Sequence, residues 1–195
     1  MGLQITRKKD NRVISAFTHK LADIPGGVTV AVKDLTQTIL NEGTPIGPDS
    51  VGLYHVVKVA ILTAAATASA TSYTVKKGHN FKVGDIIMLK KGGKAYTIAT
   101  IATNATDSTS DDITVGTTLG ATAAIGDCIY QAAAESATNV SAFKYAPKAL
   151  IGESYDVEAL NNHLVNAWTI GQVKEANIPA IGAEVKAVLT GISFI

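Results

Sequence analysis

Two apolar stretches on either side of a short Lys/Gly turn decide how this sequence folds. Residues 81–89 read FKVGDIIML, residues 95–101 read AYTIATI, and residues 90–94 between them read KKGGK. β-Branched and aromatic residues are abundant on both sides, and these residue types favour strands. The Gly92-Gly93 pair can adopt the positive φ angles that a tight hairpin turn needs. The sequence therefore predicts a β-hairpin at this place.

A second Gly-Asp step precedes another apolar run, at residues 125–130 (IGDCIY). In such a step Gly frees the backbone to turn, and the Asp carboxylate accepts hydrogen bonds from nearby N–H groups. The sequences between the two steps match poorly. We therefore predict one small β-barrel or β-sandwich over residues 51–135 with two similar corners, rather than a tandem duplication.

For the whole chain the sequence predicts a mainly β fold. An extended N-terminal arm precedes the central domain, and one or two short helices follow it. Residues 1–50 are interpreted as the arm, with short strands such as residues 28–32 (VTVAV). Residues 41–49 (NEGTPIGPD) stack turn formers and hold two prolines, so they are the predicted boundary of the arm.

Residues 136–195 form the predicted C-terminal segment. Asp156 can cap a helix over about 156–169, because Val157, Leu160, Leu164 and Trp168 recur at helical spacing. A second short helix is predicted at about 181–189, followed by a terminal strand. We expect the apolar end of the chain to be buried in its own subunit or against a neighbour.

Composition indicates a protein that makes many uncharged contacts. Of the 195 residues, 47% are hydrophobic and 17% are charged, and small uncharged residues replace the missing charge. The net charge of +1 provides no field that would attract nucleic acid or an anionic membrane. A basic cluster at residues 7–12 is either a solvated segment or an arm that docks on an acidic neighbour. The sequence predicts no signal peptide and no membrane-spanning run.

No set of residues has the spacing of a catalytic, cofactor or metal site. The histidines His19, His55, His79 and His163 lie in separate segments, where surface or structural roles are expected. The single cysteine, Cys128, excludes an internal disulfide and is predicted to be buried and inert.

Two carboxylate patterns suggest chemistry but have simpler interpretations. Asp85 and Asp127 could form an acid–base pair, but each follows a Gly at a predicted corner. Residues 107–112 (DSTSDD) could hold calcium, but they lack the Gly and the final Glu of an EF-hand loop. The sequence therefore predicts no enzymatic activity.

Four short motifs together resemble tailed-phage head proteins of the decoration or head-fibre type. They are residues 41–47 (NEGTPIG), 81–87 (FKVGDII), 125–130 (IGDCIY) and 185–195 (VKAVLTGISFI). The resemblance spans roughly residues 40–195. It implies a non-enzymatic virion protein, assembled in the bacterial cytoplasm, that binds the major capsid protein at the outer surface of the head. It further implies self-association, with a trimer favoured, and no cofactor, nucleic acid or membrane partner.

A carbohydrate-binding β-sandwich is the alternative interpretation. Its stacking platforms for a surface glycan would come from the five aromatic residues Tyr54, Tyr73, Tyr96, Tyr130 and Trp168. Against it, the tyrosines lie in predicted strands and Trp168 lies on the predicted helix stripe, where packing in the core is expected.

Overall fold

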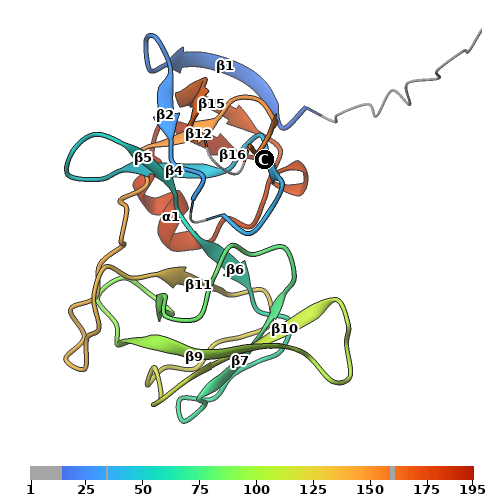
Figure 1. Ribbon diagram of the computed structural model, residues 1–195, viewed down its shortest axis with the longest axis vertical. Coiled ribbons are helices and arrows are strands. Elements are labelled where there is room, and N and C mark those ends of the chain that lie inside the picture. The colour runs from blue at the N-terminus through green and yellow to red at the C-terminus, as the bar shows by residue number, and fades with distance from the viewer. Residues whose placement is uncertain (1–14, 34, 159–160) are drawn as a thin grey trace, which may run out of the picture.

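β-Strands dominate the structure and form two bodies, one above the other (Figure 1). This computed structural model describes residues 15–33, 35–158 and 161–195. The lower body is a six-stranded barrel, and the upper body is built on a curled eight-stranded sheet with helix α1 (Ala183–Val188) beside it. The prediction of a mainly β protein with a short helix near its C-terminal end is confirmed.

The barrel is formed by strands from the middle of the chain. These strands are β6 (Val59–Ile61), β7 (Ser72–Lys76), β8 (Ile86–Met88), β9 (Ala95–Thr103), β10 (Ser110–Val115) and β11 (Cys128–Gln131). Hydrogen-bonded neighbours follow the order β6-β11-β8-β9-β10-β7. The ring closes where Leu62 bridges Val75 and the Thr63 N–H donates to the Thr74 carbonyl at 2.9 Å. The predicted hairpin is β8–β9, which pair antiparallel.

The first Gly-Asp step makes the turn that enters β8. Gly84 has a φ of 91°, which glycine adopts without strain. The Asp85 N–H donates to the Lys82 carbonyl at 3.0 Å, and the Asp85 carboxylate accepts from the Lys82 N–H at 2.9 Å. On the neighbouring strand β9, the Ile98 carbonyl accepts from the Gly84 N–H at 3.0 Å, and the Ile98 N–H donates to the Asp85 carbonyl at 2.8 Å.

The second Gly-Asp step repeats this geometry at the start of β11. Gly126 has a φ of 92°, and the Asp127 carboxylate accepts from the Ala124 N–H at 2.7 Å. Here the partner is Leu62, directly after the neighbouring strand β6: its carbonyl accepts from the Gly126 N–H at 2.9 Å, and its N–H donates to the Asp127 carbonyl at 2.8 Å. The barrel is therefore two similar three-strand units, β6–β8 and β9–β11, joined into one ring with two matching corners.

The upper body combines strands from both ends of the chain. Its sheet contains β1 (Phe17–Asp23), β2 (Val28–Val30), β4 (Pro45–Pro48), β5 (Tyr54–Val56), β12 (Ala149–Ile151), β14 (His163–Val165), β15 (Ala167–Val173) and β16 (Ile192–Phe194). The order is β1-β15-β12-β4-β5-β2-β14, and β16 pairs in parallel with β15. A separate two-stranded sheet pairs β3 (Ile39–Leu40) with β13 (Tyr155–Asp156).

The prediction of an extended arm over residues 1–50 is wrong for the part of it that the structure describes. Strand β2 pairs with β14 and β5, and β4 lies between β12 and β5. Residues 1–14, which include the whole basic cluster at residues 7–12, lie outside the described residues. The prolines that suggested a boundary stand at the two ends of β4. The Pro45 carbonyl still accepts from the Val57 N–H at 2.8 Å, so this strand pairs despite the missing donors.

The predicted helix over about 156–169 is also wrong. This region holds the end of β13, all of β14 and the start of β15, although residues 159 and 160 lie outside the description. Burial alternates with period two, because Val165, Ala167, Gly171 and Val173 are buried. Leu164, which belonged to the predicted helical stripe, is 67% exposed. Tertiary pairing with β12 and β1 outweighs a helical pattern that asparagines already weaken.

The remaining C-terminal elements agree with the sequence. Helix α1 falls inside the predicted 181–189 segment and buries Val185, while Ile181 and Leu189 are buried at its ends. A 3-10 turn, η1 (Glu175–Asn177), precedes it, and β16 is the terminal strand. Of the apolar end, Ile192 is buried and Ile195 is 56% exposed.

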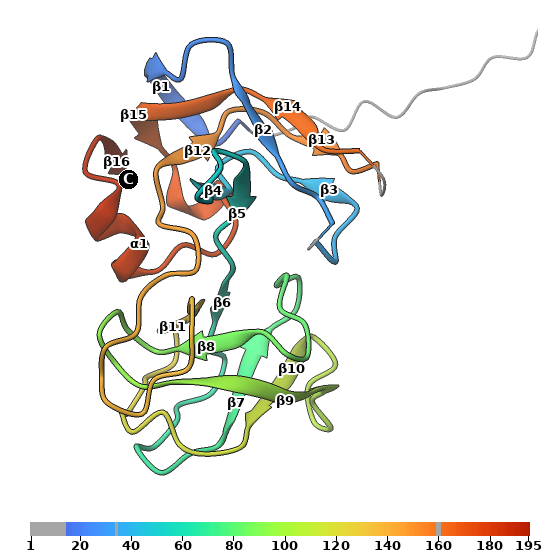
Figure 2. The same cartoon turned by 60° about the vertical axis from the view of Figure 1, so that its left-hand side comes forward.

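The two bodies share a packed core. The chain passes from β5 down to β6 and returns from β11 up to β12, so the barrel is inserted in the upper body (Figure 2). One hydrophobic cluster joins barrel residues such as Met88 and Tyr130 to upper-body residues such as Leu150, Val173 and Val185. The bodies are therefore packed against each other rather than connected only by linkers.

Candidate functional site

The two aspartates that could have formed an acid–base pair have separate structural roles. Their turns precede β8 and β11, which are antiparallel neighbours, so Asp85 and Asp127 lie at opposite ends of that strand pair. Asp85 Oδ2 accepts from the Lys58 ammonium at 2.7 Å, and Asp85 Oδ1 accepts from the Gln131 amide at 2.8 Å. Asp127 is exposed and bonds its own turn. The corner interpretation of both residues agrees with these contacts.

Lys58 is the most deeply buried charge in contact with these corners. Its side chain is 4% exposed, and that of Asp85 is 13% exposed. Lys58 lies where the chain passes from the upper body into the barrel, and its carbonyl accepts from the Gln131 N–H at 3.2 Å. A buried ion pair of this kind costs much if one partner is lost. The Lys58–Asp85 ion pair therefore holds the junction between the two bodies in one geometry.

The other predicted candidates do not converge on a common site. His19 is on β1, His55 stacks on Tyr145 with ring centroids 4.0 Å apart, and His163 Nε2 accepts from the Glu158 N–H at 3.0 Å. Cys128 is buried, and burial raises the pKa of its thiol to about 11, so the thiol stays protonated.

The carboxylates of the 107–112 loop bond to different partners. Asp107 accepts from Thr109 and Ser110, and these bonds lower its pKa to about 2. Asp112 accepts from Thr74 and Asn104, while Asp111 pairs with Lys77 at 3.6 Å. Over residues 15–33, 35–158 and 161–195, no cluster of three or more His, Cys, Asp or Glu side chains could hold a metal ion.

The five aromatic residues considered for glycan stacking do not form a platform. Tyr54, Tyr73 and Tyr130 are buried, in three different hydrophobic clusters. Tyr96 and Trp168 are half-buried and pack against two of those clusters. No helix in the described part of the chain is long and apolar enough to cross a membrane.

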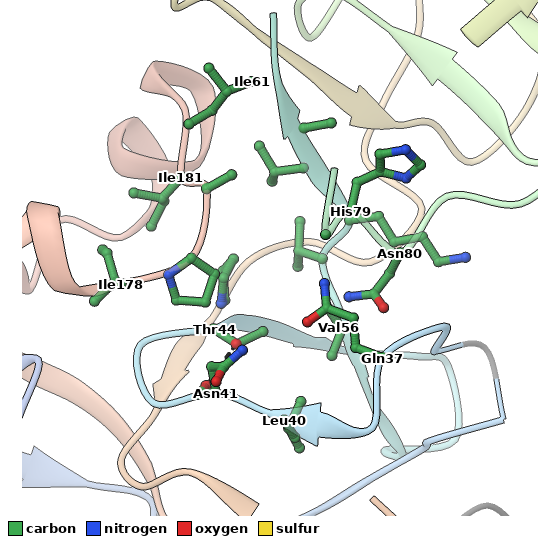
Figure 3. Close-up of a pocket in the computed structure, with 18 of the residues that line it drawn as sticks. Gln37, Leu40, Asn41, Thr44, Val56, Ile61, His79, Asn80, Ile178 and Ile181 are labelled. Carbon is green, nitrogen blue, oxygen red and sulfur yellow. Dashed lines mark hydrogen bonds between the residues drawn. The ribbon is translucent and has the colours of Figure 1, made fainter. Parts of the chain in front are cut away.

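A cleft of about 560 Å³ between the two bodies is the candidate functional site. Four chain segments line it, namely residues 35–45, 56–61, 76–80 and 175–181, together with Ser154. Its size lies within the range of pockets that hold small molecules or short peptide segments. In Figure 3 the isoleucines Ile61, Ile178 and Ile181 lie on one side, and Gln37, His79 and Asn80 lie on the other.

Charged groups at the cleft are almost all neutralised by a partner. Lys58 pairs with Asp85, Lys77 with Asp111, and Glu175 with Lys186. Glu42 lies 3.8 Å from Lys20, and its carboxylate also accepts from the Ala16 N–H at 3.0 Å. Among the described lining residues only Lys76 lacks an ion-pair partner. The cleft therefore presents a neutral interior to a ligand.

Besides Asn177, which donates to the Ser15 carbonyl at 3.4 Å, three primary amides line the cleft with hydrogen-bonding capacity to spare. Gln37, Asn41 and Asn80 are half-buried there. The side chains of Gln37 and Asn41 and the Nδ2 group of Asn80 make no hydrogen bond to another residue that the structure describes. Each amide offers donors and an acceptor without charge. The cleft can thus bond a neutral polar ligand on one side while its isoleucines contact apolar groups on the other.

His79 fixes the turn that closes one end of the cleft. Its Nδ1 accepts from the Phe81 N–H at 3.2 Å, and its Nε2 lies 3.4 Å from Asp111 Oδ2. Burial lowers the pKa of this imidazole, an effect that Asp111 opposes and Lys58 assists. The same turn reaches the upper body, because the Thr36 hydroxyl donates to the His79 carbonyl at 3.1 Å and the Thr36 N–H donates to Asn80 Oδ1 at 3.1 Å.

Sequence reasoning missed this cleft because it is assembled from distant segments. Gln37 and Asn80 are far apart in the chain, and Ile178 comes from a third region. The only local signal is the stretch of turn formers at 76–80, which gives no indication of its neighbours. Comparisons of the chain with protein-family models, with curated proteins and with solved structures found no match.

Proposed function

We propose that this chain is a non-enzymatic structural protein of a tailed-phage head. It self-associates, with a trimer favoured, and binds the major capsid protein on the outer surface of the virion. The sequence motifs that resemble head decoration and head-fibre proteins support this proposal. Two of those motifs form the matching corners of the barrel, and a third contributes to α1 and β16.

The structural observation that favours self-association is the exposed edge of the eight-stranded sheet. Strand β1 pairs with β15 alone, and five of its seven residues are exposed. Leu21 is 71% exposed, and Ile170 on the neighbouring strand is 45% exposed and aligned with Ala22. Bulges in the β1–β15 register disfavour the simple addition of another strand. A neighbour would therefore contact this edge through side chains.

Light scattering of the purified full chain, joined to a binding assay, tests the proposal. We expect a stable trimer that co-sediments with assembled heads of the phage or prophage that encodes it. Leu21→Asp should weaken self-association, because it would place a charge in the contact. Val51→Asp is the matched control, since Val51 is 85% exposed at the tip of the β4–β5 hairpin. A strict monomer that does not bind heads would overturn the proposal.

A further inference from the structure

We propose that the cleft between the two bodies binds an extended, uncharged peptide segment of a partner protein. The aliphatic side chains of that segment would contact the isoleucine side of the cleft, and its backbone would bond the amide side. This inference goes beyond head binding, because it concerns a different surface from the β1 edge. It rests on the chemistry of the cleft alone.

Charge complementarity excludes strongly charged ligands. A phosphate or carboxylate would meet Lys58 and Lys77, which each already contact an aspartate. The third lining lysine, Lys76, has no ion-pair partner among the described residues but is exposed, so its ammonium keeps its hydration in water. A cationic ligand would meet Glu42 and Glu175, which are likewise paired. Displacing the partners of Lys58 or Glu42 would leave a buried charge without compensation, which is costly, whereas Lys77 and Glu175 are exposed and their pairs contribute little. The ligand that fits is therefore neutral where it lies in the cleft.

The amide groups match the pattern of an extended backbone. Gln37 and Asn41 can each accept from a peptide N–H and donate to a peptide carbonyl, whereas Asn80, whose Oδ1 already accepts from Thr36, can donate through its Nδ2 group. Recognition of an extended chain by backbone hydrogen bonds, with separate pockets for alternate side chains, is a common binding mode. In Figure 3 Gln37 and Asn80 lie across the cleft from the isoleucines and Asn41 lies beside Thr44, so the cleft provides both parts.

The apolar side of the cleft distinguishes a peptide from a sugar. Ile61, Ile178 and Ile181 are aliphatic, and neighbouring Pro179 and Leu40 are aliphatic as well. A sugar ring is usually held on the flat face of an aromatic side chain, and the described lining includes no Phe, Tyr or Trp. Branched aliphatic walls instead suit an aliphatic side chain, which gains by leaving water.

The test uses the full chain labelled with 15N and a defined probe. The probe is a library of acetylated, amidated hexapeptides in which Val, Leu or Ile alternates with Ser, Thr or Gln. Side-chain amide resonances of Gln37, Asn41 and Asn80 report directly on the cleft. We expect saturable shifts of these resonances, whereas peptides with Glu or Lys at the alternate positions should leave them unchanged.

Two matched variants sharpen the test. Gln37→Leu keeps the bulk of the side chain but removes its amide, and it should weaken peptide binding about three- to tenfold, the usual value of one hydrogen bond. Thr38→Val changes the exposed neighbour outside the cleft and should have no effect. Absence of binding by every alternating peptide would overturn the proposal. If maltohexaose shifted the same amide resonances and no peptide did, the peptide proposal would be overturned in favour of a glycan site.

Discussion

The His79 imidazole makes the stability of this protein sensitive to mild acid. It is buried as a neutral ring whose Nδ1 accepts from the Phe81 N–H, so protonation would remove that bond. Because its folded pKa is lowered, the unfolded chain takes up this proton first as the pH falls. The free energy of unfolding should therefore decrease between about pH 6.5 and the lowered folded pKa, and stay constant above that window for this group.

Urea unfolding of the wild type and of His79→Gln at a series of pH values measures this contribution. Histidines His19, His55 and His163 are retained in both proteins, so the difference between the two curves isolates His79. The wild-type curve should fall more steeply on acidification. Parallel curves would show that the His79 proton is not linked to folding.

Asp85 and Asp127 occupy equivalent turns, yet their substitution should have unequal consequences. Asp85→Asn would leave the buried Lys58 ammonium without its counter-charge, at a cost of about 3 kcal/mol. Asp127→Asn weakens one exposed turn bond and should cost about 1 kcal/mol or less. Chemical denaturation of both variants measures the difference. The double variant Lys58→Met with Asp85→Asn should recover most of the stability that Asp85→Asn loses. If Asp85→Asn and Asp127→Asn lost equal stability, this account would be wrong.

The two Gly-Asp turns need glycine because of its backbone conformation, not because a side chain would lack room. A Cβ atom at Gly84 or Gly126 would meet nothing within 4 Å, but both residues have φ near +90°. Gly84→Ala and Gly126→Ala should each lower the free energy of unfolding by about 1–2 kcal/mol, from backbone strain alone. Gly116→Ala is the control, because Gly116 also has open space around it but lies outside the positive-φ region. Equal stability of all three variants would contradict the strain argument.

The same turns explain why the barrel could be predicted from sequence. A Gly with positive φ and an Asp that bonds its own turn act within four residues, so their signal is local. Strand β15 shows the opposite case. Val157, Leu164 and Trp168 are compatible with a helix in isolation, and only pairing with β1 and β12 makes the region extended. Strand β1 lies near the other end of the chain, so no local pattern could reveal this pairing.

At the scale of the whole molecule, α1 is held to the barrel by a contact that depends on a glycine. A methyl group at Gly182 would overlap the Tyr130 hydroxyl, which accepts from the Glu184 N–H at 3.4 Å. Gly182→Ala should therefore push the two bodies apart locally and cost about 1–3 kcal/mol, as overpacking does. Limited proteolysis within residues 133–148, together with urea unfolding, measures the loosening.

A double-variant cycle controls for unrelated effects of this change. Tyr130→Phe removes the hydroxyl that the new methyl group would meet, so adding it to Gly182→Ala should recover part of the lost stability. If the two changes were simply additive, the contact with the Tyr130 hydroxyl would not be the cause of the loss.

The union of residues 15–57 with the C-terminal segment is the feature that the sequence could not reveal. Each part alternates like strands, and neither part alone has enough strands to cover its apolar face. Val30 and Val165, for example, pack in one hydrophobic cluster although they come from opposite ends of the chain. The cleft exists only because this union places Gln37 and Ile178 beside the barrel.

The insertion of the barrel between β5 and β12 also sets the order in which the chain can complete its parts as it leaves the ribosome. Every strand of the barrel is translated before β12, so the barrel has all its strands while β1, β2 and β4 still wait for β15, β14 and β12. During that interval Val30, Ile46 and Val56 are uncovered and open to aggregation. The last stretch to be translated, which carries β14, β15 and β16, is the one that removes these side chains from water.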